Sequence, residues 1–302
     1  MATMKKLYID SRFAEGNGSN FSLELPETVN CSQDCVCYVV DVSFPIAWHT
    51  IDINNDKIFL LEMTPDSPST PRARVVKIPI KDYTLGSDLV AQVKAALNAP
   101  GVAASFKYVP GTYDVTFNQS TFSLTVTLAG GGTFTILSFD QLRDPSFFHS
   151  WRYYATQSVL PVVQAAMHGS YVYERANPKT ANDVLRISMQ EGNTHLQIGT
   201  TQIGGSIDLR PVHTIYLTSE NFSGYDVIGP GGGLRSTILK ITITEPSKGL
   251  QYHEHSGHSE DYISVGGMSL KTLKFALRDS FGNVVSLNGG HCAFSLLFAE
   301  RP

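Results

Sequence analysis

The amino-acid sequence predicts a mainly β protein, a β-sandwich interrupted by a small inserted α+β domain. Three observations support this prediction. Short runs rich in Val, Ile, Thr, Tyr and Phe recur between Gly, Pro, Asn and Asp residues. One segment has clear helical periodicity. Two polar, turn-rich stretches separate the middle of the chain from its beginning and its end.

The predicted strands are short and separated by turn residues, as in sandwiches and barrels. They include residues 21–25, 36–44, 58–62, 75–80, 112–117, 123–128, 213–217, 237–244, 273–278 and 293–298. In the run at 273–278, Leu273, Phe275 and Leu277 alternate with polar or small residues, so these three side chains should face the core. The following segment, residues 279–283, predicts a tight hairpin turn in which Gly282 supplies a positive φ if one is needed.

The predicted helix covers residues 84–98. Its apolar residues Leu85, Leu89, Val93 and Leu97 follow each other at intervals of four, which places them on one face. Thr84 is a candidate N-cap, and a proline at position 100 ends the helix.

Domain boundaries are predicted from composition. Residues 64–71 contain three prolines and resemble a linker, and residues 177–205 are polar and rich in turns. We therefore expect residues 1–65 and 205–302 to form one discontinuous domain and residues 70–200 to form the α+β insertion. The two flanks hold about eight strand candidates, the number in a single jelly roll.

Composition excludes some functions. The chain has 302 residues, a formal net charge of −4 and 17% charged residues. A weakly acidic chain offers no electrostatic footprint for a specific nucleic-acid contact. No run approaches 18 apolar residues, so we expect no membrane span, and the first ten residues contain no apolar signal segment. Synthesis in a reducing compartment is the expectation that follows.

The four cysteines are Cys31, Cys35, Cys37 and Cys292. The first three are close together in sequence, but they lack the second pair of ligands that structural zinc sites use. Cys35 and Cys37 also fall in a predicted strand. We therefore expect free thiols in a β core.

The strongest candidate for an enzymatic site is a metal-binding site. His253, His255 and Glu260 are spaced as in the first metal motif of cupins, and two histidines at i and i+2 share a face of a strand. The second half of that motif fails, because Asn288 replaces its proline and His291 lies two positions early. We predict no metal, cofactor or catalytic site, and keep a cupin-like metal-dependent enzyme as the alternative. A His-rich loop that makes a pH-dependent contact is a weaker hypothesis.

The aromatic residues near Trp151 favour core or interface packing, with a carbohydrate-binding platform as an alternative. The glycine run at 229–233 lacks the residues of a phosphate-binding loop, so we expect an ordinary loop.

The order of short motifs along the chain resembles one family. These motifs are LYIDSR (7–12), NFSLELP (20–26), CYVVDV (37–42), FPIAWHTID (44–52), NNDKIF (54–59), IPI (78–80), NDVLR (182–186), IDLR (207–210), IYL (215–217), DYI (261–263), LKTLKF (270–275), RDSFGN (278–283) and LNGGHCAFSL (287–296). Together they resemble the penton, or minor capsid, protein of Polinton (Maverick) elements, adintoviruses and virophage-like viruses. One departure is GGGLR (231–235), where members of the family carry a more charged turn.

The resemblance implies a fold and a function. The fold is a single jelly roll, and the function is structural: homopentamers at the fivefold vertices of an icosahedral capsid. The implied partners are other copies of this chain and a double jelly-roll major capsid protein. The insertion would project outward and could contact a host surface receptor. The expected location is the virion, at a capsid vertex assembled inside the host cell.

Overall fold

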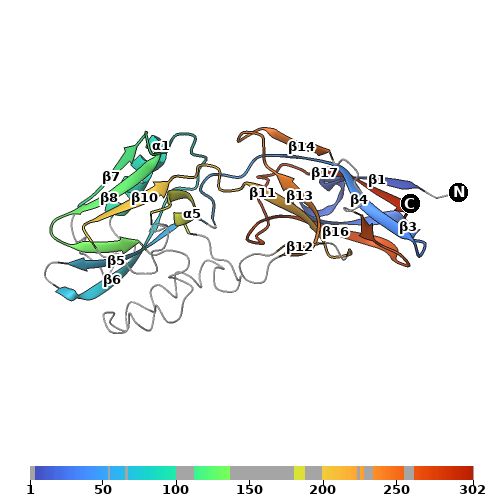
Figure 1. Cartoon of the computed structure of the whole chain (residues 1–302), viewed down its shortest axis with the longest axis horizontal. Helices are drawn as coiled ribbons and strands as arrows, with labels where there is room; N and C mark the ends of the chain where they lie inside the picture. The colour runs from blue at the N-terminus through green and yellow to red at the C-terminus, as the bar shows by residue number, and fades with distance from the viewer. Residues whose placement is uncertain are drawn as a thin grey trace. The chain divides into compact units, whose positions relative to one another are not determined.

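A computed structural model describes residues 4–53, 55–64, 67–99, 112–136, 180–187, 199–222, 225–227, 234–254 and 262–301 (Figure 1). The chain divides into two compact units. The first consists of Met1–Trp48 and Val212–Pro302, and the second is His49–Pro211. Each unit has its own cluster of buried apolar side chains.

The first unit is built from strands and one turn of 3-10 helix. In chain order its elements are β1 (Lys5–Asp10), η1 (Ser11–Phe13), β2 (Glu15–Asn17), β3 (Asn20–Asn30), β4 (Cys35–Pro45), β11 (Thr214–Ser219), β12 (Tyr225–Val227), β13 (Leu234–Thr242), β14 (Leu250–Glu254), β15 (Ile263–Ser264), β16 (Ser269–Asp279) and β17 (Ala293–Glu300).

These strands form two sheets. The first sheet has the order β1-β17-β4-β14, with β15 also pairing with β4, and the second has the order β12-β13-β11-β16-β3-β2. Eight of the strands form four nested antiparallel pairs: the first with the last (β1·β17), then β3·β16, β4·β14 and β11·β13. Nested pairs divided between two sheets are the strand order of a jelly roll, so the predicted fold class is confirmed.

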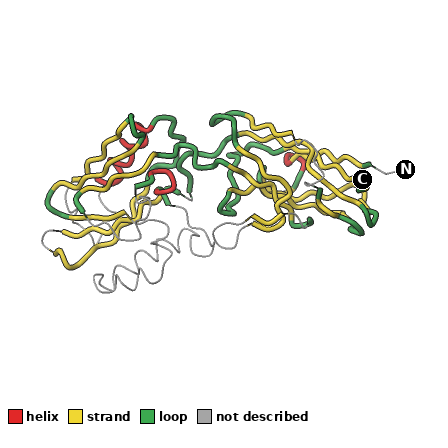
Figure 2. The backbone as a smooth tube through the Cα atoms, in the orientation of Figure 1, coloured by secondary structure: helices red, strands yellow, loops and turns green. Residues whose placement is uncertain are grey.

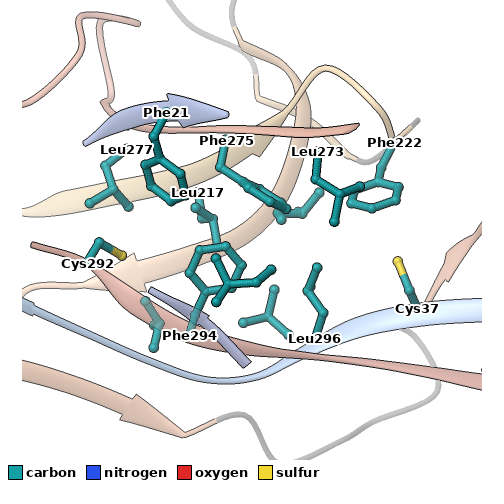
Figure 3. Packing of buried hydrophobic residues seen from close by; sticks show 14 of the residues in the cluster. Phe21, Cys37, Leu217, Phe222, Leu273, Phe275, Leu277, Cys292, Phe294 and Leu296 are labelled. Atoms are coloured by element: carbon teal, nitrogen blue, oxygen red, sulfur yellow. The ribbon is translucent and has the colours of Figure 1, made fainter. Parts of the chain in front are cut away.

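The core of the first unit lies between the two sheets. Figure 3 shows Phe21, Phe275 and Leu217 of the second sheet pointing toward Phe294 and Leu296 of the first. The ring of Phe275 lies at the centre: its centroid is 4.9 Å from that of Phe294 and 5.9 Å from that of Phe21. Leu273, Phe275 and Leu277 are all buried, as their alternation predicts.

The predicted turn at residues 279–283 is also confirmed. Gly282 has a φ of +85°. The Asp279 side chain accepts hydrogen bonds from the backbone N–H groups of Phe281 and Asn283 at 2.9 and 3.0 Å.

Two hydrogen bonds join the beginning of the chain to its end. Ser11 N–H donates to the carbonyl of Cys292 at 2.9 Å, and Cys292 N–H donates to Ser11 Oγ at 3.0 Å.

The second unit combines two small sheets with helices (Figure 2). Its elements are β5 (Lys57–Thr64), β6 (Ser67–Lys77), α1 (Gly86–Asn98), β7 (Thr112–Asn118), β8 (Ser123–Ala129), β9 (Thr133–Ile136), α5 (Asn182–Leu185) and β10 (Thr201–Ser206). One sheet has the order β10-β8-β7 and the other β6-β5-β9. The core includes Tyr113 and Phe134, whose rings meet edge to face at 5.2 Å.

Helix α1 differs from the prediction at its start. It begins at Gly86, and its N-cap is Leu85, which makes no side-chain capping bond, so Thr84 is not the cap. Leu85 is 58% exposed and takes no part in the apolar face, whereas Leu89, Val93 and Leu97 are buried with Val90. A side chain at position 86 would collide with the ring of Phe117, since an added Cβ would lie 2.5 Å from it.

Three predictions about boundaries differ from the structure. The proposed linker at 64–71 is wrong, because Thr64 ends β5 and Ser67 begins β6, and the two are partners in an antiparallel ladder. Pro68 and Pro71 are compatible with β6 because it is the edge strand of its sheet, where a missing backbone N–H is tolerated. The same pairing assigns β5 to the second unit, which is His49–Pro211. Residues 49–65 and 205–211 therefore do not belong with the jelly roll, as the predicted boundaries had placed them. The turn-rich stretch at 177–205 contains most of strand β10.

Candidate functional site

The outer surface of the first sheet exposes apolar and aromatic side chains. The register places outward-facing residues in rows across the sheet: Lys6–Leu297–Tyr38, Tyr8–Ser295–Asp41–Glu254, Asp10–Ala293–Ser43–Tyr252 and Pro45–Leu250. Tyr8 is 79% exposed, Leu250 64% and Tyr252 58%. We call the surface formed by Tyr8, Tyr38, Leu250 and Tyr252 the tyrosine face.

The charges on the tyrosine face are mainly acidic. Strand β4 contributes Asp41 and β14 contributes Glu254. Burial, and then the nearby carboxylates of Glu254 and Asp41, raise the pKa of Tyr252 above its ordinary value.

Two cations lie at the edge. Lys6 Nζ is 5.1 Å from the centroid of the Tyr8 ring and 3.9 Å from Asp41 Oδ2. Arg12 Nη2 donates to Asp10 Oδ2 at 2.5 Å.

The outer surface of the second sheet is hollowed. A cavity of about 370 Å³ lies over strands β3, β11 and β16. Its lining includes the small side chains of Thr218 and Ala276, which are cross-strand partners. Two acidic and two basic residues also line it: Glu15, Glu220, Lys274 and Arg278. We call this cavity the outer hollow. It arises because short outward side chains in the middle of the sheet are flanked by long ones.

Hydrogen bonds hold the walls and floor of the outer hollow in place. Thr218 Oγ1 donates to the carbonyl of Ala276 at 3.1 Å. Lys274 Nζ donates to Glu220 Oε2 at 3.0 Å, and Arg278 Nη1 donates to the carbonyl of Gly282 at 2.9 Å. Lys274 is therefore paired with an acid that lines the same hollow.

Of the three residues of the alternative metal site, the structure describes only His253. It lies on β14 opposite Val42. His255 and Glu260 lie outside the described residues. Within the described ranges, no group of three or more His, Cys, Asp or Glu side chains is arranged to hold a metal.

The four cysteines are free thiols, as predicted. Cys35, Cys37 and Cys292 are buried and Cys31 is half-buried. Burial raises the pKa of Cys37 to about 12 and that of Cys292 to about 12. Burial, and then the neighbouring thiol of Cys35, raises the pKa of Cys31 to about 11. Cys31, Cys37 and Cys292 therefore stay protonated near neutral pH.

Other candidates lie outside the described residues. They are Trp151 with its neighbouring aromatic residues and the glycine run at 229–233. Among the residues that the structure does describe, no helix is long and apolar enough to cross a membrane.

Neither the tyrosine face nor the outer hollow was predicted from the sequence. Each depends on which strands are neighbours: Tyr8 and Tyr252 are far apart in the chain and share a surface only because β1 and β14 flank β17 and β4. The sequence does contain one indication of the tyrosine face. In their strands apolar and polar residues alternate, and Tyr8 and Tyr252 stand at positions where polar residues are expected, which places their side chains outward.

Comparisons with known proteins give matches among solved structures. No family profile and no curated protein sequence matches the chain. The chain is similar to the penton protein of mavirus, with 8% identity over 98% of this chain and 99% of that chain and a TM-score of 0.46. It is also similar to a chain of the Sputnik virophage structure, with 9% identity over 98% of both chains and a TM-score of 0.43. Both TM-scores are below 0.5, so the fold assignment rests on the strand order described above.

Proposed function

We propose that the protein is a structural minor capsid (penton) protein that forms homopentamers at the fivefold vertices of an icosahedral virus-like capsid. The observation that carries the proposal is the strand order of the first unit. The resemblance in sequence implies a single jelly roll, and the eight nested strands form one.

The motifs that carry the resemblance support the proposal by their places in the fold. The head motif at 7–12 lies in β1 and η1, and the tail motif at 287–296 leads into β17, which pairs with β1. The motif at 278–283 forms the turn after β16. Motifs from opposite ends of the chain therefore build one continuous region of the sandwich.

The surface of the sandwich suits a subunit of a larger assembly. Single exposed apolar residues are common on soluble proteins, but several on one sheet face mark an interaction surface. Tyr8, Leu250 and Tyr252 share such a face. A role without catalysis agrees with this picture and is part of the proposal.

Partners and location follow from the same proposal. The jelly roll would contact a double jelly-roll major capsid protein at the vertex, and the second unit would be the part available for a host receptor. The protein would then be found in the virion, at capsid vertices assembled inside the host cell.

The test is co-production of this chain with the matching major capsid protein, followed by electron microscopy of purified particles. The proposal predicts density for five copies of the jelly roll at each fivefold vertex, and vacant vertices when this chain is left out. Particles whose vertices are filled without this chain would contradict it.

The cupin-like alternative has its own test. Elemental analysis of purified protein would show stoichiometric Fe, Mn or Zn that is lost in His253→Ala. We expect no stoichiometric metal in either protein.

A further inference from the structure

We propose that Cys31 and Cys35 form a redox-responsive pair, which closes to a disulfide bond in an oxidising medium. The bond joins the residue that follows β3 to the first residue of β4, and β3 and β4 belong to different sheets. The chemistry of the pair is a property of the chain itself. Its use after a particle leaves the cell rests on the proposed function, because release takes the chain from a reducing to an oxidising medium.

Three of the four thiols gather in one part of the jelly-roll core. Cys35 and Cys37 belong to this core, two positions apart on the inward side of β4, and Cys31 packs against it. Cys292 lies elsewhere: Figure 3 shows it at the opposite end of the core from Cys37. The first three thiols are therefore candidates for a bond, and Cys292 is not.

Among these three, Cys31 and Cys35 interact most directly. The thiol of Cys35 acts on Cys31 through its charge and through a side-chain hydrogen bond, whereas Cys31 acts on Cys37 through charge alone. Cys35 and Cys37 are neighbours on one side of one strand, so their side chains project in parallel. A disulfide needs two side chains that point toward each other, which excludes that pair.

The backbone holds Cys31 and Cys35 on either side of a tight turn. Cys35 N–H donates to the carbonyl of Ser32 at 3.1 Å. Cys31 N–H donates to the carbonyl of Met268 at 2.9 Å, and the carbonyl of Cys35 accepts from Val265 N–H at 3.0 Å. Both cysteines are thus anchored to the segment between β15 and β16. Because the two ends are already fixed near each other, closing the bond has a small entropic cost.

The oxidant is a small disulfide such as oxidised glutathione. Cys31 is half-buried, so it is the thiol of the pair that the oxidant reaches first. Its thiolate attacks one sulfur of the oxidant and releases the first glutathione thiolate. The thiolate of Cys35 then attacks Sγ of Cys31 and releases the second. Two protein thiols are oxidised, one small disulfide is reduced to two thiols, and the two protons from the cysteines pass through solvent to the leaving thiolates.

The experiment compares the full chain with three variants. Cys31→Ser and Cys35→Ser each remove one partner, and Cys37→Ala is the matched control, because it removes a nearby thiol that the bond does not use. Each protein is kept overnight at pH 8 with glutathione that is either mostly reduced or mostly oxidised. Free thiols are then alkylated in urea, and peptides are mapped by mass spectrometry.

We expect four free thiols in wild type under reduced glutathione. Under oxidised glutathione, wild type and Cys37→Ala should contain the Cys31–Cys35 cross-link, and Cys292 should stay free. Cys31→Ser and Cys35→Ser should contain no cross-link within the chain. Circular dichroism verifies folding, and alanine replaces serine in a variant that fails to fold.

Two results would overturn the proposal. One is wild type that keeps Cys31 and Cys35 free, or carries only a glutathione adduct on Cys31, under oxidised glutathione. The other is a cross-link between Cys31 and Cys37 that persists in Cys35→Ser. Neither result depends on a capsid, so both leave the proposed function standing. Particles whose vertices are filled without this chain would overturn the proposed function and leave the cross-link unaffected.

Thermal unfolding tests what the bond does. Closing it should raise the midpoint of unfolding of the jelly roll by roughly 4–8 °C in wild type, because the unfolded chain loses freedom around the turn. Cys35→Ser should show the same midpoint under reduced and oxidised glutathione. Cross-linked wild type with an unchanged midpoint would contradict a stabilising role for the bond.

Discussion

Phe275 shows how single residues hold the sandwich together. It lies on β16 with its ring against Phe294 of the opposite sheet and near Phe21 and Phe222, 5.9 and 6.4 Å away. Such clusters exclude water from the space between the sheets. Because the ring is 2% exposed, its loss would leave a cavity that its neighbours cannot fill.

We predict that Phe275→Ala destabilises the first unit by about 3–5 kcal/mol. Phe13 is the matched control, because it is 86% exposed and its loss should change stability by less than about 0.5 kcal/mol. Urea unfolding followed by fluorescence measures both. Equal stabilities for the two variants would show that Phe275 is not at the centre of the core.

The thiols give a second prediction at this scale. In native protein at pH 8, Cys37 and Cys292 should not react with an aromatic disulfide reagent, because both are buried and protonated. Cys31 is half-buried with a pKa of about 11, so it should react about 100-fold more slowly than a thiol with the ordinary value of 9.0. Peptide mass spectrometry after timed labelling identifies the modified residue. Labelling of Cys37 at the rate of urea-unfolded protein would refute this prediction.

At the scale of elements, the turn between β16 and the segment that follows depends on Gly282. Its φ of +85° is accessible to glycine at little cost, whereas a Cβ adds strain. We expect Gly282→Ala to cost about 1–2 kcal/mol of stability and Gly282→Asn to cost less, because asparagine tolerates this region better. Thermal unfolding of both variants measures the difference. Alanine and asparagine variants of equal stability would mean that backbone strain is not what glycine relieves here.

The elements that could be predicted from sequence are those with strong local patterns. Leu273, Phe275 and Leu277 alternate in β16, and Leu89, Val93 and Leu97 repeat in α1, so burial of both sets follows from periodicity. The predicted strand at 75–80 covers only the end of β6. The first part of β6 was not predicted because proline normally signals a loop, whereas an edge strand tolerates proline. Strand β10 was missed because Gly204 and Gly205 interrupt its pattern.

The remaining features could not be predicted because they depend on pairing between strands that are distant in the sequence. The pattern of β5 predicts a strand but does not say which sheet it joins, and its pairing with β6 and β9 assigns it to the second unit. The tyrosine face and the outer hollow could not be predicted from the sequence for the same reason, because each is assembled from strands far apart in the chain.

At the scale of the whole molecule, the second unit is inserted between the third and fourth of the eight jelly-roll strands. Among the residues that the structure describes, the apolar core of the first unit contains none from 49–211, and the core of the second unit contains none from outside that range. The jelly roll therefore has all of its strands and its core without the insertion.

We predict that replacing residues 49–211 with a flexible Gly/Ser linker leaves the jelly roll folded. The shortened protein should retain a β-type circular dichroism spectrum and a cooperative unfolding transition, because every described residue in the core of the first unit is kept. A protein that unfolds without cooperativity would show that the jelly roll needs the insertion.

The central claim is that identical copies of this chain close a ring of five. Native mass spectrometry of the purified full-length protein tests it most directly. Five copies of a 33.0 kDa chain predict a species of about 165 kDa that grows with concentration at the expense of monomer. A single species of 33.0 kDa at every concentration would contradict the claim.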